Sequence, residues 1–200
     1  MTRGMPEDIY ISFDVEADGP YPGRYSMLSV GLCVAGHRVG GKYRPVDPRA
    51  RSFYIELKPV TDNYLSEAMA VNRLDRALLE QTASAPAVAM SEVRQWIVNV
   101  SRSHQPVLIA YPATFDWPFL SHYFHEYCPA GPPLSFTRVL DLRTIIVTKA
   151  GTDAYCPTAE ALPPEIHRPG PHTHHALDDA VQQAELFSRV ASWDATPLPR

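Results

Sequence analysis

Two carboxylates, Asp14 and Glu16, stand two residues apart at the end of segment 9–16, which is rich in β-branched and aromatic residues. Alternate residues of a strand point to the same face, so both side chains emerge together. Bringing two acids together on an apolar strand costs free energy unless a cation neutralises them or one keeps its proton. The pair indicates a cation site or, as the plainer alternative, two solvent-facing acids at a fraying strand end.

Two further segments carry residues that suit the same chemistry. Asp116 follows the apolar segment 106–111, where a strand gives way to a helix. Ligands bind at this rim in α/β folds, although a helix N-cap would also explain the aspartate. In the run HHALDDA, residues 174–180, a histidine loop enters a helix that carries two acids. The alternative here is a helix with a polar start, because the helix dipole favours aspartate there.

Hydrophobic periodicity predicts the elements that position these residues. Segments 9–16, 27–34 and 52–57 read as successive strands, which suggests an antiparallel meander, and the connection 36–48 reads as a hairpin turn. After Pro59 helices alternate with strands. Segments 74–79 and 93–100 are helical, 106–111 is a buried strand, and the next helix has Pro118 in its first turn. Segment 138–148 fits a strand and a helix, and 176–190 the last helix.

Composition limits the class of protein. The chain has 200 residues, of which 45% are hydrophobic, so we expect one domain over residues 1–200 with a core from about 9 to 190. A net charge of −4 excludes a uniformly basic clamp for nucleic acid but leaves room for local phosphate contacts. Three widely separated cysteines argue against a disulfide framework. The short apolar stretches and the acidic start predict a cytoplasmic protein without a membrane span.

Together, the three motifs resemble the DEDDh branch of the 3′ to 5′ exonucleases, which includes RNase T, oligoribonuclease and proofreading exonucleases. The sequence has FDVE at 13–16 for the family's F-D-x-E, FD at 115–116 for its F-D, and HHALDDA at 174–180 for its H-x-A-x-x-D-A. Their order and rough spacing agree with the family over residues 9–190. The resemblance implies an RNase H-like α/β fold. That fold is a mixed five-stranded sheet flanked by helices, in which a three-strand meander precedes alternating helices and strands.

The resemblance also implies a catalytic set. Two divalent cations, Mg²⁺ or Mn²⁺, would be bound by four acids: Asp14, Glu16, Asp116 and Asp179. Asp14 would bridge the ions, Glu16 and Asp179 would hold the nucleophile's metal, and Asp116 would lie near the other. Oxygen ligands favour such hard cations, and two of them can clamp a scissile phosphate. His174 would be the general base, and the product would be a nucleoside 5′-monophosphate.

The choice between the two neighbouring histidines rests on the motif. His175 and Asp179 are four residues apart and would share a helix face, which favours His175 if both are helical. The family instead has the base five residues before the last aspartate, on the loop entering the helix, so we choose His174 and keep His175 in reserve. A zinc site at His172, His174 and His175 is less favoured because no fourth ligand lies at a suitable spacing. Asp178 reads as a solvated first-turn acid.

Motif position further suggests neighbours for the terminal nucleotide, namely Ala17, Leu28 and Phe115, although Leu28 and Phe115 would suit the core equally well. The family commonly has asparagine at the position of Pro112 and threonine at that of Ala17. Neither change removes a metal ligand, so we expect activity with unfamiliar substrate contacts. Four arginines near the strand connections could meet phosphates further along, or form a solvated surface: Arg24, Arg44, Arg49 and Arg51.

The expected function is therefore a metal-dependent 3′ to 5′ exonuclease acting on single-stranded nucleic acid, with RNA favoured over DNA. Nothing in the sequence encodes base-specific readout, so stacking and metal contacts would hold the chain end. The related small exoribonucleases suggest a homodimer. Two alternatives stay open: a DNA exonuclease for repair or proofreading, and a catalytically silent nucleic-acid-binding module on the same fold.

Overall fold

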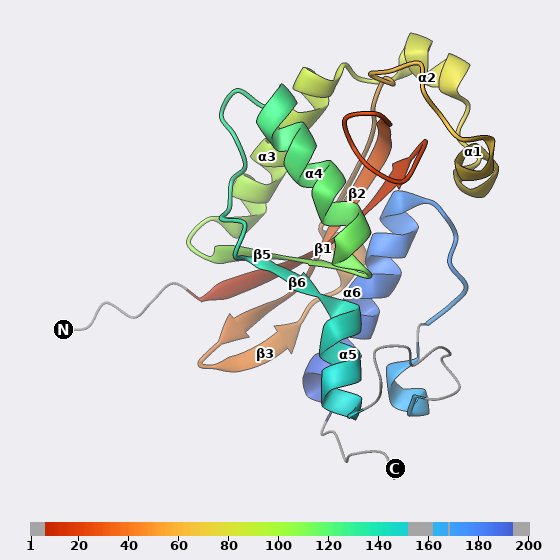
Figure 1. The fold of residues 1–200 in the computed structure, drawn as a ribbon. Coiled ribbons are helices and arrows are strands. Elements are labelled where there is room, and N and C mark those ends of the chain that lie inside the picture. The colour runs from red at the N-terminus through yellow and green to blue at the C-terminus, as the bar shows by residue number, and fades with distance from the viewer. Residues whose placement is uncertain (1–6, 152–161, 168, 194–200) are drawn as a thin grey trace.

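The computed structural model describes residues 7–151, 162–167 and 169–193, and its strands and helices are drawn in Figure 1. The strands are β1 (Asp8–Ala17), β2 (Met27–Val39), β3 (Lys42–Pro45), β4 (Ser52–Glu56), β5 (Gln105–Ala110) and β6 (Val139–Asp141). The helices are α1 (Ser66–Asn72), α2 (Arg76–Thr82), α3 (Pro86–Ser101), α4 (Ala113–Tyr127), α5 (Leu142–Ala150) and α6 (Ala176–Ser192). None of the described helices combines the length and apolar character that a membrane crossing requires.

The sheet is mixed, as expected, and β1 lies at its centre. Its strand order is β3-β2-β1-β5-β6, with β4 also paired to β2. Strands β1 to β4 pair antiparallel, whereas β5 and β6 run parallel to β1. The meander followed by alternating helices and strands is therefore confirmed.

The connection 36–48, predicted as a hairpin turn, contains a sixth strand, β3, in addition to the five that were expected. Strand β2 continues to Val39, past its predicted end at residue 34, and pairs with β3. Gly40 and Gly41 form the turn between them with positive φ angles of 56° and 76°, which glycine adopts without steric cost. The extension escaped prediction because Gly36 and the polar His37 and Arg38 interrupt the apolar pattern.

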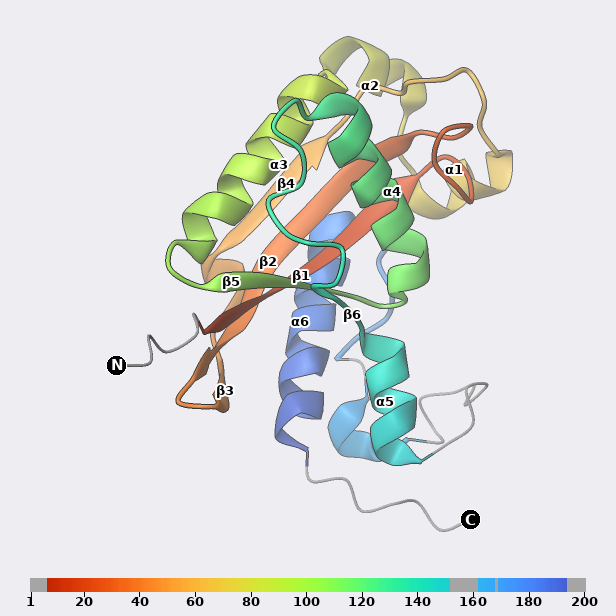
Figure 2. The same cartoon turned by 60° about the vertical axis from the view of Figure 1, so that its left-hand side comes forward.

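Strand β1 separates two cores, one on each face of the sheet. Its residues Ile9, Phe13 and Val15 belong to the core that α3 and α4 complete, whereas Tyr10 belongs to the core against α6. Figure 2 shows α3 and α4 on one face of the sheet and α6 on the other. Because side chains alternate along a strand, Asp14 and Glu16 face the α6 side.

Helix α4 begins earlier than predicted. It starts at Ala113 with Pro112 as its N-cap residue, so Pro118 lies inside the helix and not in its first turn. Proline removes one backbone hydrogen bond of a helix interior, here the one that would reach Thr114. Asp116 consequently lies within the first turn of α4 and is not its N-cap residue.

Helix α1 was not predicted. It has only seven residues, too few to show a helical period, and Asn72 is its buried residue. The Asn72 side chain donates a hydrogen bond to the carbonyl oxygen of Ala17 at 3.0 Å, which ties α1 to the end of β1. A tertiary contact of this kind leaves no local pattern in the sequence.

Candidate active site

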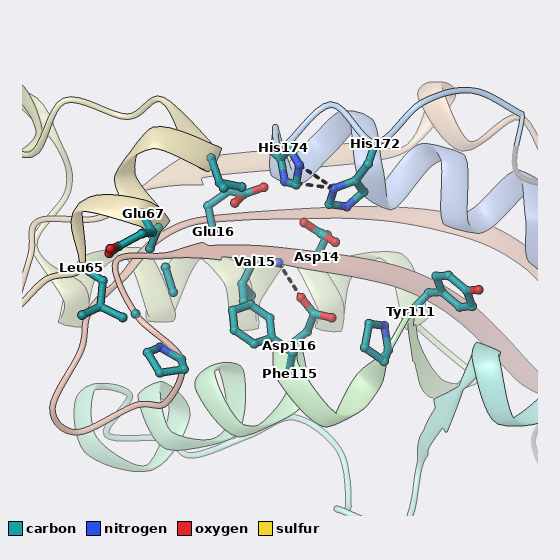
Figure 3. A pocket seen from close by; sticks show the side chains of 16 residues that line it. Asp14, Val15, Glu16, Leu65, Glu67, Tyr111, Phe115, Asp116, His172 and His174 are labelled. Atoms are coloured by element: carbon teal, nitrogen blue, oxygen red, sulfur yellow. Dashed lines mark hydrogen bonds between the residues drawn. The ribbon is translucent and has the colours of Figure 1, made fainter. Parts of the chain in front are cut away.

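A cavity of about 510 Å³ opens where β1 ends, between α1, the start of α4 and the loop that precedes α6 (Figure 3). Its polar wall contains Asp14, Glu16, Asp116, His172 and His174. Its apolar wall includes Ala17, Leu65, Ala68, Val71 and Phe115. The cavity thus combines a dense set of acids with a surface that suits a flat, uncharged group.

Three of the four predicted metal ligands meet in this region. Carboxylate oxygens of Asp14, Glu16 and Asp179 lie within 4.8 Å of one another, and these residues are only 5%, 8% and 0% exposed. Burial, followed by the charges of Asp179 and Asp116, raises the pKa of Glu16 to about 8. Several negative charges at this spacing out of water are unfavourable without a cation or a proton. The oxygen-only donor set fits a hard divalent cation.

Asp116 enters the cavity from the opposite side of β1, as Figure 3 shows. Its Oδ1 accepts a hydrogen bond from the backbone N–H of Val15 at 3.0 Å. Strand β5 pairs with β1 only as far as Ser12, so the Val15 amide lies beyond β5 and is satisfied by this side chain. Burial raises the pKa of Asp116. The fourth acid therefore lines the same cavity but stands outside the cluster of three.

Gly31 explains how Asp179 reaches the strand acids. It is the β2 partner of Asp14, and a Cβ at this position would lie 2.3 Å from the backbone nitrogen of Leu177. The missing side chain allows the first turn of α6 to lie directly against β2, beside Asp14. Gly31 was not predicted as a site residue, although a glycine inside an apolar strand is a signal of close backbone approach.

Gln183 is a second residue that sequence analysis missed. It is fully buried one helical turn after Asp179, and its Nε2 donates to Oδ1 of Asp14 at 2.7 Å. Its Oε1 is buried without a hydrogen-bond partner among the described residues. The amide thus fixes the orientation of the Asp14 carboxylate. Its i+4 spacing from Asp179 was the available signal.

The loop before α6 is tied to Asp179. The backbone N–H groups of Thr173 and His174 donate to Oδ1 and Oδ2 of Asp179 at 3.0 and 2.7 Å. These bonds accompany a left-handed backbone at His174, with φ of 56°. The His174 ring lines the cavity, 3.0 Å from His172 between their Nδ1 atoms. His172 also approaches Oδ2 of Asp179 at 3.3 Å through Nε2, a contact that sequence analysis did not foresee.

His175 has a different environment from His174. It is the N-cap of α6, where its Nδ1 accepts a hydrogen bond from the Asp178 backbone at 3.4 Å. Its ring stacks on Tyr54 with centroids 4.6 Å apart, and it is not among the residues that line the cavity. Asp178 is exposed beside Arg49, as expected of a solvated acid. Within the described residues no group of three metal ligands includes the histidines, so the zinc alternative finds no support.

The expectation for Leu28 needs correction. Ala17 and Phe115 line the cavity, but Leu28 is fully buried in a core cluster with Leu79 and Ala83 and does not reach the cavity. The alternative of a core residue therefore applies to Leu28. Leu65, the N-cap residue of α1, supplies an exposed aliphatic side chain to the apolar wall instead.

Comparison with known proteins gives consistent matches. The family model of the 3'-5' exoribonuclease Rv2179c-like domain matches residues 71–191, more than half of the chain. The 3'-5' DNA exonuclease Cap18 of Escherichia coli is 33% identical over 189 residues, which cover 92% of each chain.

Solved structures share the fold. One is E. coli exonuclease I in complex with a dT13 oligonucleotide, with a TM-score of 0.63 and 14% identity over 92% of this chain, which spans 41% of that protein. Another is cell-death related nuclease 4, with a TM-score of 0.67 and 16% identity over 95% of this chain and 66% of that one. On the family match and the 33% identity, the chain belongs to the Rv2179c-like family of 3′-5′ exonucleases.

Proposed function

We propose that this exonuclease hydrolyses the 3′-terminal phosphodiester bond of single-stranded nucleic acid with two divalent cations, Mg²⁺ or Mn²⁺. The observation that carries the proposal is the cluster of Asp14, Glu16 and Asp179, whose buried oxygens lie within 4.8 Å of one another in one region of the molecule. Asp116 lines the adjoining cavity and completes the donor set.

Each polar residue of the site then has a role. Asp14 would hold both cations, Glu16 and Asp179 the one beside the attacking water, and Asp116 the other. When bound, such ions lower the pKa of water and stabilise charge on phosphate oxygens. His174, on the cavity wall, would take the proton of the attacking water. His172, 3.0 Å away, would hold the His174 ring in place.

The apolar wall suits the terminal nucleoside. Phe115 is 37% exposed on the first turn of α4, and its ring can stack on a base whatever the base identity. Ala17 and Leu65 border the same space. This wall supplies no hydrogen-bonding pattern for one base, so we propose trimming without strong base specificity.

RNA is the first candidate substrate, because the family model is described as an exoribonuclease domain. DNA is the second, because the E. coli relative that is 33% identical is named a DNA exonuclease.

We further propose that the chain acts as one domain over residues 1–200. We also propose that it forms a homodimer, whose mass light scattering would measure.

The test uses 5′-labelled single-stranded RNA and DNA of one sequence, each with Mg²⁺, Mn²⁺ or a chelator. We expect a ladder that shortens from the 3′ end only with metal, and the faster substrate identifies the class. Asp14→Asn should abolish the ladder, and His174→Ala should slow it by about 10²- to 10⁴-fold. His125→Ala, which changes an exposed histidine on α4, is the control and should behave as wild type. Binding without cleavage in all variants would instead identify a silent binding module.

A further inference from the structure

A second cavity, of about 720 Å³, lies at the other end of β1. It is bordered by the β2–β3 hairpin, the segment before β4 and the connection from α3 to β5. Its charged lining consists of Arg44, Arg51 and Arg102, together with His37 and His104, and contains no acid. We call these five residues the basic groove. Three arginines in one cavity are notable in a chain of net charge −4.

The fold brings the arginines together from distant parts of the sequence. Arg44 on β3 is paired with His37 on β2, and the carbonyl of Arg51 accepts a hydrogen bond from Val34, also on β2, at 3.0 Å. Arg102 directly follows α3 with a left-handed φ of 46°, a strained conformation for a residue with a side chain. Figures 1 and 2 both show the β3 end of the sheet far from α1, which borders the active-site cavity.

The three guanidinium groups are available for a ligand. Among the described residues, none of them makes an ion pair or a side-chain hydrogen bond, whereas Arg76 and Arg138 pair with Asp18 and Asp8. All three arginines of the groove are exposed. Unpaired like charges in one groove repel each other, and an anion that bridges them removes this repulsion.

The two histidines form the inner part of the groove. Their ring centroids lie 5.0 Å apart, and Nδ1 of His37 is buried without a hydrogen-bond partner among the described residues. Burial, then His104 and Arg51, lower the pKa of His37, as expected beside positive charge. A buried polar atom without a partner costs free energy that a ligand or an ordered water recovers. The groove therefore has an unused polar group as well as unpaired cations.

We propose that the basic groove binds phosphate groups of a nucleic-acid strand outside the active site. Guanidinium groups bind phosphate through paired donors, and several unpaired arginines suit a ligand whose charges repeat along a chain. The assignment of that strand to the substrate, on the 5′ side of the reacting end, rests on the proposed function. Arg44 and Arg51 belong to the set that the sequence suggested for phosphates. Arg49, by contrast, faces Asp178 at 3.5 Å, and Arg24 lies over the Tyr25 ring.

The distance between the sites sets a length requirement. His37 pairs with Ile9, and Asp14 lies five residues further along β1, which corresponds to about 17 Å at 3.3 Å per residue. Ile9 and Asp14 also face opposite sides of the sheet. At the 3.4 Å rise of a stacked strand this separation corresponds to about five nucleotides, and the path around the sheet adds to it. A trinucleotide can occupy the active site alone.

The test compares the triple variant Arg44→Gln, Arg51→Gln, Arg102→Gln with a control that loses three arginines elsewhere: Arg94→Gln, Arg143→Gln, Arg189→Gln. Fluorescence anisotropy with a labelled 20-nucleotide strand in chelator measures binding without hydrolysis. The groove variant should bind about tenfold more weakly at 0.1 M salt, and its slope of log K against log salt should fall by about 2. The control should retain the affinity of the wild type within about twofold. Equal losses in both variants would overturn the proposal.

Hydrolysis separates this inference from the proposed function. The groove variant should raise KM for the 20-nucleotide strand and leave trinucleotide hydrolysis unchanged, and an equal loss on the trinucleotide would overturn the proposal. If the wild type cleaves nothing but the groove variant still loses binding, the proposed function fails and the groove stands. Competition by polyglutamate as strong as that by inorganic polyphosphate would indicate an acidic protein partner and contradict the assignment.

Discussion

The two ends of β1 both gather charges of one sign, but they do so in opposite surroundings. At the carboxyl end, Asp14 and Glu16 are nearly buried beside Asp179. At the other end, the arginines of the basic groove are exposed to water. Coulomb repulsion is several-fold stronger in a poorly solvated site than at the surface, where salt also screens it. We therefore expect metal and pH to affect the cluster of acids, and salt to affect ligand binding in the basic groove.

The most severe test of this contrast removes one buried charge. Asp179→Asn should lower kcat/KM by about 10³-fold, because the loss of a proposed metal ligand removes several kcal/mol of transition-state stabilisation. Asp178→Asn removes the same charge from the adjacent, exposed position and should change kcat/KM by less than about twofold. Steady-state hydrolysis of a short oligonucleotide measures both. Equal losses would mean that charge near α6, and not the buried cluster, determines activity.

A smaller effect is expected from the residue that orients Asp14. Gln183→Leu keeps most of the side-chain volume but removes the 2.7 Å hydrogen bond to the Asp14 carboxylate. Loss of such a supporting contact lowers metal affinity or activity by about 10- to 100-fold. The diagnostic readout is the metal concentration at half-maximal rate, which should rise.

Gln81→Leu is the matched control for that experiment. Its side chain is exposed on α2 and donates to the carbonyl of Ala77, so the metal dependence should stay that of the wild type. If Gln183→Leu lowers thermal stability but leaves the metal dependence unchanged, Gln183 contributes only to packing.

The contrast between the two ends also explains what the sequence could predict. Asp14 and Glu16 lie on a strand whose alternation is local, so their shared face was predictable from residues 9–16. The run 174–180 likewise indicated the start of helix α6. Local pattern and motif order were enough for the general fold and for the acids.

The residues that escaped prediction act through tertiary contacts. Gly31 matters because α6 lies on it, and Gln183 because Asp14 lies opposite it. Motif position suggested Leu28 as a neighbour of the terminal nucleotide, but in the fold Leu28 lies in the core. The basic groove joins β3, the start of β4 and the end of α3, which are separated in sequence by up to about sixty residues. The spacing of residues along the chain does not show which distant segments pack together.

The pH dependence of stability tests the burial of the acids directly. Since burial and neighbouring acids raise the pKa of Glu16 to about 8, the folded chain keeps a proton that the unfolded chain releases near pH 4.5. Glu16 therefore contributes stability below about pH 4.5 that is lost as the pH rises through 8. Urea unfolding in chelator should show wild type losing stability relative to Glu16→Gln between pH 5.5 and 8.5. Added Mn²⁺ should restore the wild type at pH 8.5, and parallel pH profiles would contradict this account.

The mildest expected effect concerns His175, which caps α6 and does not line the cavity. His175→Ala removes the N-cap acceptor of α6 and the ring that stacks on Tyr54, so the free energy of unfolding should fall by about 1 kcal/mol. Because the ring does not line the cavity, kcat/KM should stay within about threefold of wild type. His174→Ala should show the reverse pattern, with activity lost and stability kept. If instead His175→Ala loses the larger share of activity, the general base is His175, and the loop must rearrange when substrate binds.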